Sequence, residues 1–172
     1  TRDPSAPSAR LTAGSDARAG ASVASGWGDA DHGLGLTAGY QRLSGFSATN
    51  PDSIFSFDPD DDGYRNRNLS LRGRTALGNQ RLAASLVTTD ADVEFDQGDT
   101  QARNTSAGVT LGGELGEGWT HLLTAGHARE DLDTVSSFSN AFQSRRTSLD
   151  WVNTVDAGPD ASVNVGVNWQ RE

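Results

Sequence analysis

The sequence contains no cysteine and no methionine, and none of its apolar runs is long. Without cysteine the chain can form no disulfide framework, no thiolate metal site and no thiol nucleophile. Residues 1–10 lack the apolar stretch of a signal peptide, and no apolar run is long enough for a transmembrane helix. Any part of this sequence that crosses a membrane must therefore do so as β-strands.

Positive charge is also scarce. The 14 basic residues are all arginine, and 23 acidic residues outnumber them, which gives a net charge of −9. A balance of this sign argues against a nucleic-acid partner. The hydrophobic content of 34% and the 20 glycines are typical of partial disorder and equally of a β-barrel with a polar lumen. Composition leaves both interpretations open, and periodicity has to decide between them.

What the sequence does contain is a regular alternation of apolar residues with small or polar ones. Successive side chains of a strand point to opposite faces, so this pattern predicts strands with one apolar and one polar face. The clearest segments are 19–27, 34–41, 69–76 and 162–169, followed by 82–88, 107–111, 119–125 and 149–155. No stretch of useful length has the helical period of 3.6. We therefore expect an all-β, antiparallel, up-and-down meander of about nine strands.

The alternation also assigns side chains to faces. On a face directed at lipid we expect Leu34, Leu36, Leu69, Leu71, Leu149, Val163, Val165 and Val167. On a face directed at a lumen we expect Arg72, Arg74, Asn164 and Asn168. Trp27 and Trp119 fall at the ends of predicted strands, where aromatic rings form the girdle of a membrane barrel. The alternative is that both are ordinary core tryptophans.

The predicted connections are short at one end of the meander and mostly long at the other. Short breaks fall at residues 3–8, 28–32, 77–80, 112–118 and 157–160. Long polar segments cover residues 44–66, 89–103 and 130–146, with a tight reversal at 16–18 as the exception. Outer-membrane barrels have this asymmetry. Because nine strands leave two unpaired edges, which lipid does not tolerate, we interpret residues 1–172 as a fragment of a large transmembrane β-barrel.

An acidic segment precedes Gly63. Asp58, Asp60 and Asp62 place carboxylates at every second position, which suits a hard cation such as Ca²⁺. An EF-hand is excluded, because Leu69 stands where the closing glutamate belongs and the flanking segments are predicted strands. A second acidic cluster consists of Asp90, Asp92, Glu94, Asp96 and Asp99. The two clusters predict either a Ca²⁺ site or a solvated acidic rim, and the sequence chemistry favours neither.

The sequence has no catalytic constellation, since serine, aspartate and histidine occur without the context of a triad. We expect a protein that is not an enzyme. Several short motifs follow one another along the chain in this order: Thr1-Arg2-Asp3-Pro4, Leu11–Gly14, Gly28-Asp29, Tyr40, Gly45-Phe46, Asp62-Gly63-Tyr64 and Gly166–Gln170. In this order and spacing they resemble the TonB-dependent cobalamin (vitamin B12) receptors of the Gram-negative outer membrane, over nearly the whole chain.

The resemblance implies a set of binding residues. Members of that family bind calcium in two extracellular loops, whose ligands correspond here to Asp58, Asp60, Asp62, Asp96 and Asp99. Positions that contact the substrate correspond to Gln97 and Asn140. A further family aspartate is replaced by Ser47, which implies a weaker site or a single ion.

The resemblance further implies an active transporter in the bacterial outer membrane that imports cobalamin, with TonB and membrane lipid as partners. The plug domain, the segment that contacts TonB and the remaining strands of that family are absent from this sequence. Two alternatives stay open: a TonB-dependent receptor for a siderophore or another nutrient, and a soluble Ca²⁺-binding β-sandwich that acts as an adhesion module.

Overall fold

The structure is a computed structural model of the chain, and it describes residues 6–47, 49–50, 52, 59–96 and 98–172. Its strands are β1 (Ser8–Ala13), β2 (Ala19–Gly28), β3 (His32–Leu43), β4 (Tyr64–Leu77), β5 (Gln80–Phe95), β6 (Gly98–Gly116), β7 (Trp119–Val135), β8 (Asn140–Gly158) and β9 (Ala161–Arg171).

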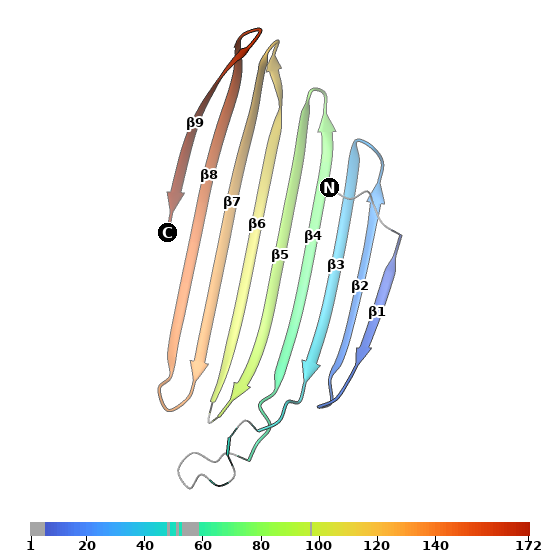
Figure 1. Ribbon diagram of the computed structural model, residues 1–172, viewed down its shortest axis with the longest axis vertical. Helices are drawn as coiled ribbons and strands as arrows, with labels where there is room; N and C mark the ends of the chain where they lie inside the picture. The colour runs from blue at the N-terminus through green and yellow to red at the C-terminus, as the bar shows by residue number, and fades with distance from the viewer. Residues whose placement is uncertain (1–5, 48, 51, 53–58, 97) are drawn as a thin grey trace.

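Each strand pairs with the next strand of the chain in antiparallel orientation, so that one sheet runs in the order β1 to β9 (Figure 1). The predicted all-β, nine-stranded, up-and-down meander is confirmed. β1 and β9 form the two edges of the sheet, and they do not pair with each other. No helix in the described part of the chain is long and apolar enough to cross a membrane.

This sheet has no second layer. None of the described hydrophobic residues is buried, and the accessible surface area is 12132 Å². A compact monomer of 18.1 kDa would expose about 8,000 Å². A β-sandwich buries the inner faces of two sheets against each other, so the sandwich alternative is wrong for the described residues. Both faces of the sheet are left uncovered by the residues that the structure describes.

The strand register divides the side chains between the two faces as the alternation predicts. Directly paired residues point to the same face, and Leu36 pairs with Leu71, which pairs with Leu86. Following such pairs from strand to strand places all eight predicted apolar residues on one face. The same pairs place the predicted lumen residues, Arg72, Arg74, Asn164 and Asn168, on the other. We call these the apolar face and the polar face.

The loop predictions were correct at one end of the sheet and largely wrong at the other. The short turns after β2, β4, β6 and β8 lie together at the end that we call the short-turn end (Figure 1). At the opposite end, the loop end, residues 44–63 separate β3 from β4. Residues 89–103 and 130–146, however, are mostly strand, because β5, β6, β7 and β8 extend through them. Polar residues were misread there as loop.

The turn between β2 and β3 shows how the short-turn end is fixed. The N–H groups of Asp31 and His32 donate to Oδ1 of Asp29, at 2.9 and 2.7 Å. These two bonds stabilise the ionised carboxylate and so hold the pKa of Asp29 below its usual range. The bond from His32 has the larger effect on this pKa, and the bond from Asp31 has the smaller one. Nη2 of Arg74 donates to the backbone oxygen of Asp29 at 3.0 Å, which ties the turn to β4.

Candidate functional site

The apolar face carries a continuous band of hydrophobic side chains across the sheet. On β9 the band consists of Val163, Val165, Val167 and Trp169, which are 50–65% exposed. On β3 it consists of Leu34, Leu36, Ala38 and Tyr40, and the strands between them continue it through the paired positions. An uncovered band of this extent is far larger than the scattered apolar residues of a soluble surface.

Toward the loop end, the band is followed by a line of charged residues, most of them arginine. On β3, β4 and β9 the arginine comes directly after the band, whereas on β5 to β8 one threonine or histidine lies between the band and the charged residue. On each of the strands β3 to β9 we take the first charged residue that follows the band on the apolar face. These residues are Arg42, Arg67, Asp90, Arg103, Arg129, Arg145 and Arg171. Six of the seven are arginine, in a chain with more acidic than basic residues. We call this set the arginine border.

The arginine border crosses the strands obliquely. The row of paired residues through Arg42 reaches β8 at Ala141, whereas Arg171 pairs with Thr147, six residues further along β8. The border thus shifts by six residues, each about 3.4 Å long, while it crosses six strand spacings of about 4.8 Å. The strands are therefore inclined by about 35° from the perpendicular to the border. The strands of membrane barrels are tilted by roughly 35–45°.

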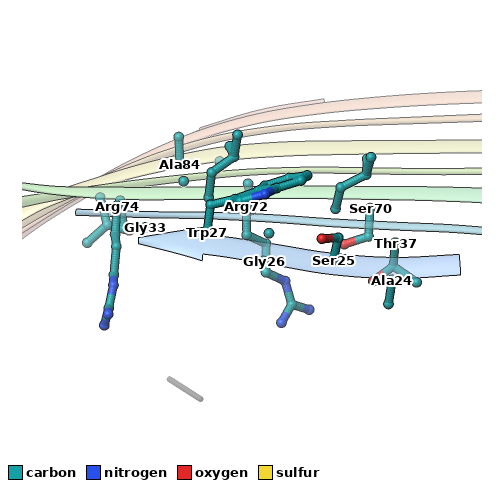
Figure 2. Close-up of a pocket in the computed structure, with 18 of the residues that line it drawn as sticks. Ala24, Ser25, Gly26, Trp27, Gly33, Thr37, Ser70, Arg72, Arg74 and Ala84 are labelled. Atoms are coloured by element: carbon teal, nitrogen blue, oxygen red, sulfur yellow. The ribbon is translucent and has the colours of Figure 1, made fainter. Parts of the chain in front are cut away.

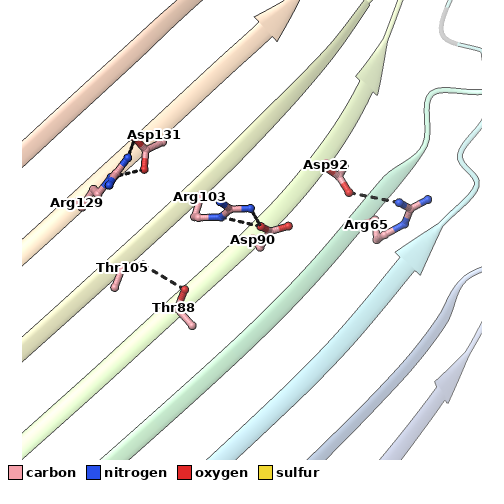
Figure 3. A network of polar contacts seen from close by, with 8 residues as sticks. All are labelled: Arg65, Thr88, Asp90, Asp92, Arg103, Thr105, Arg129 and Asp131. Atoms are coloured by element: carbon pink, nitrogen blue, oxygen red, sulfur yellow. Dashed lines mark hydrogen bonds and ion pairs between the residues drawn. The ribbon is translucent and has the colours of Figure 1, made fainter.

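Ion pairs neutralise the aspartates at and just beyond the border (Figure 3). Arg103 binds Asp90 at 2.8 Å and Arg129 binds Asp131 at 2.6 Å, while Arg65 lies 3.4 Å from Asp92. In each pair the arginine side chain is the more exposed partner, at 45–68% against 25–35% for the aspartate. The carboxylates therefore lie close to the sheet, and the guanidinium groups extend away from it.

The short-turn end of the band has polar and aromatic groups that bond to each other. Nε1 of Trp119 donates to Oδ1 of Asn153 at 3.1 Å, and Nε2 of His121 lies 2.6 Å from Oε1 of Gln80. Trp27 ends the band on β2 beside the turn. The predicted placement of Trp27 and Trp119 at the short-turn end of the apolar face is confirmed, and neither is a core residue, being 54% and 41% exposed.

The polar face has a groove at a place where several of the lining residues are glycine and have no side chain to fill it (Figure 2). Its volume is about 740 Å³, and Gly26, Gly33, Gly35 and Gly108 are part of the lining. A Cβ atom at Gly35 would meet nothing within 4 Å. The guanidinium groups of Arg72 and Arg74 project from the same side of the sheet beside it. Arg72 and Arg74 give the groove a cationic side, whereas most of its other lining residues are glycine, alanine, serine and threonine.

The two predicted calcium segments do lie next to each other at the loop end. The N–H of Gly63 donates to Oε2 of Glu94 at 3.2 Å, and the N–H of Glu94 donates to the oxygen of Gly63 at 2.8 Å. Asp60 and Asp62 are in the segment that leads into β4, and Asp99 is on β6, paired with Glu94.

These contacts do not complete a cation site. Asp96 follows β5 directly, and Asp58 lies outside the described residues. Within the part of the chain that the structure describes, no three acidic or histidine side chains are grouped so that they could hold a metal ion. The remaining predicted ligands therefore do not enclose Ca²⁺ without further groups, and the calcium site stays a prediction.

The two predicted substrate residues have different outcomes. Gln97 lies outside the described residues. Asn140 begins β8 and pairs with Thr134, whose side chain bonds to Thr100 on the polar face at 3.0 Å. Asn140 is therefore at the loop end of the polar face, and its contact with a substrate stays a prediction.

Sequence reasoning missed the arginine border. Part of its signal was present on three strands, where an apolar or aromatic residue lies two positions from an arginine: Tyr40 with Arg42, Leu69 with Arg67, and Trp169 with Arg171. Only the strand register places Arg103, Arg129 and Arg145 on the same line. No protein-family model and no curated protein matches this chain.

Proposed function

We propose that this chain forms part of the wall of a transmembrane β-barrel in a bacterial outer membrane. The observation that carries the proposal is the oblique arginine border. A soluble sheet has no reason to end its apolar residues along a line at about 35° to the strand normal, whereas tilted membrane strands must do so at the plane of the lipid headgroups.

The energetics of the sheet support a lipid environment. Every strand is hydrogen-bonded to its neighbours, so the backbone between β1 and β9 needs no water. The apolar band has no protein partner within the described chain. Hydrocarbon would remove this apolar surface from water, which is favourable, without burying polar side chains. The open edges of β1 and β9 would pair with further strands in a closed barrel.

The transport function that we propose rests on the sequence resemblance. The full-length protein would be a TonB-dependent receptor that binds and imports cobalamin. The polar face, with Asn140 at its loop end, would line the passage. TonB would act through the plug segment that the resemblance to this receptor family implies. A siderophore receptor of the same class is the alternative outcome of the test.

The test measures cobalamin binding to the full-length protein, with calcium and with a chelator. We expect binding in calcium and a loss of affinity of about 5- to 150-fold in chelator, the usual range for coupled ligands. Asp60→Ala together with Asp99→Ala should weaken cobalamin binding similarly, abolish its calcium dependence and reduce direct Ca²⁺ binding. The control, Asp31→Ala with Asp160→Ala, removes two charges at the short-turn end and should change nothing.

The outcomes separate the parts of this proposal. No cobalamin binding, with binding of a ferric siderophore instead, would refute the cobalamin assignment and leave the barrel wall intact. Equal binding in calcium and in chelator would mean that Asp60, Asp62, Asp96 and Asp99 form a solvated acidic rim.

A further inference from the structure

We propose that the arginine border binds the phosphate groups of anionic lipids whose acyl chains cover the apolar band. This inference rests on the proposed barrel wall and adds a lipid selectivity to it. Where hydrocarbon covers an apolar face, the next side chains along that face lie at the level of the headgroups. On this sheet the first charged side chains at that end of the apolar face are arginine on six of the seven strands β3 to β9.

The charge along the apolar face changes with distance from the band. The border itself has six arginines and Asp90, and Asp90 is neutralised by Arg103. Further out on the same face, Arg65 is matched by Asp92. Beyond them Glu94 and Asp99 oppose each other directly. On this face of the described chain, arginines without an acidic partner therefore lie only in the border, although the chain as a whole carries a net charge of −9.

Like charges face each other across neighbouring strands at and beside the border. Arg42 pairs directly with Arg65, and Arg129 pairs directly with Arg145. Directly opposed like charges destabilise a sheet. Asp92 and Asp131 already pair with Arg65 and Arg129. A further anion is therefore needed only by Arg42 and Arg145. Phosphate suits these positions, because guanidinium binds it with two parallel hydrogen bonds.

Some of these arginines have their donors available. In the portion of the chain that is described, the side chains of Arg42, Arg67, Arg145 and Arg171 make no hydrogen bond or ion pair, and all four residues are exposed. They are spread over four strands along the edge of the band, with no enclosing pocket. A line of separate donors fits a row of lipid headgroups better than one small soluble anion.

The test uses the full-length protein in phosphatidylcholine bilayers that contain increasing phosphatidylglycerol. Spin-labelled lipids report which lipid is immobilised at the protein surface. We expect selectivity for phosphatidylglycerol in the parent. Arg67→Gln with Arg145→Gln should raise the half-saturating mole fraction of phosphatidylglycerol by about five-fold or more, given the usual gain from each basic residue near an anionic surface. Arg67→Lys with Arg145→Lys keeps both charges and should retain most of the selectivity.

The matched control is Arg72→Gln with Arg81→Gln, which removes the same charge from the polar face and should leave lipid selectivity unchanged. Equal loss in both glutamine variants, or no selectivity in the parent, would overturn the inference while leaving the barrel wall in place. If no lipid of either kind is immobilised by the parent protein, the proposed wall itself fails.

Discussion

Replacing Val167 with arginine in the full-length protein should lower its folding stability in a bilayer by about 2–4 kcal/mol, the cost of a cation near the middle of a barrel's lipid-facing surface. Val167 is 65% exposed and lies in the band opposite Trp151. The expected loss comes from placing a guanidinium group in hydrocarbon. Reversible unfolding by denaturant in lipid vesicles measures it.

The control for this substitution is Asn168→Arg on the same strand. Asn168 points to the polar face and bonds to Asp150, so an arginine there gains a carboxylate partner and should change stability by less than about 0.5 kcal/mol. If water covers both faces, Val167→Arg should be as neutral as the control, because a mostly exposed valine contributes little. Equal effects of the two substitutions would contradict the membrane account.

The second large effect is expected at the turn between β2 and β3. Gly28 has a φ of +147°, in a region that L-residues with side chains rarely adopt. A Cβ atom there would overlap the carbonyl oxygen of His32 and lie 2.6 Å from Cα of Gly33. Gly28→Ala should therefore destabilise the full-length protein by about 1–3 kcal/mol, measured by the same unfolding assay.

Gly35 provides the matched control, on the next strand and on the polar face. A Cβ atom at Gly35 meets nothing within 4 Å, and its backbone is an ordinary part of β3. Gly35→Ala should be neutral or slightly stabilising, because it reduces the entropy of the unfolded chain. A Gly28→Ala variant as stable as Gly35→Ala would show that the turn differs from the one described here.

The strands and their two faces could be predicted from the sequence because alternation is a local property. Leu34 and Leu36, or Val165 and Val167, identify a face without knowledge of any partner strand. The prediction from the sequence was wrong at the loop end, where polar segments that are strands were predicted to be loops. There Asp90 and Asp92 alternate with Ala91 and Val93, and the alternation continues with charge in place of an apolar side chain.

The strand extensions needed knowledge of partners that no single segment contains. Asp90 is stabilised by Arg103 of the next strand, and Thr100 bonds to Thr134 across β6 and β7. The arginine border depends on register in the same way, since Arg42 and Arg171 are far apart in sequence. For the calcium site the limit is different: Gly63, directly after Asp62, bonds to Glu94 of β5, but Asp58 and Gln97 lie outside the described residues.

The central claim, that the apolar face contacts lipid and the polar face contacts water, is tested most directly by a nitroxide scan of β9. Residues 163–170 are labelled one at a time in the full-length protein in a bilayer, and collisions with oxygen and with a water-soluble nickel chelate are measured. We predict that oxygen accessibility peaks at Val163, Val165, Val167 and Trp169. Nickel accessibility should peak at the residues between them. Peaks for both reagents at the same residues, or high nickel accessibility at Val165 and Val167, would contradict the account.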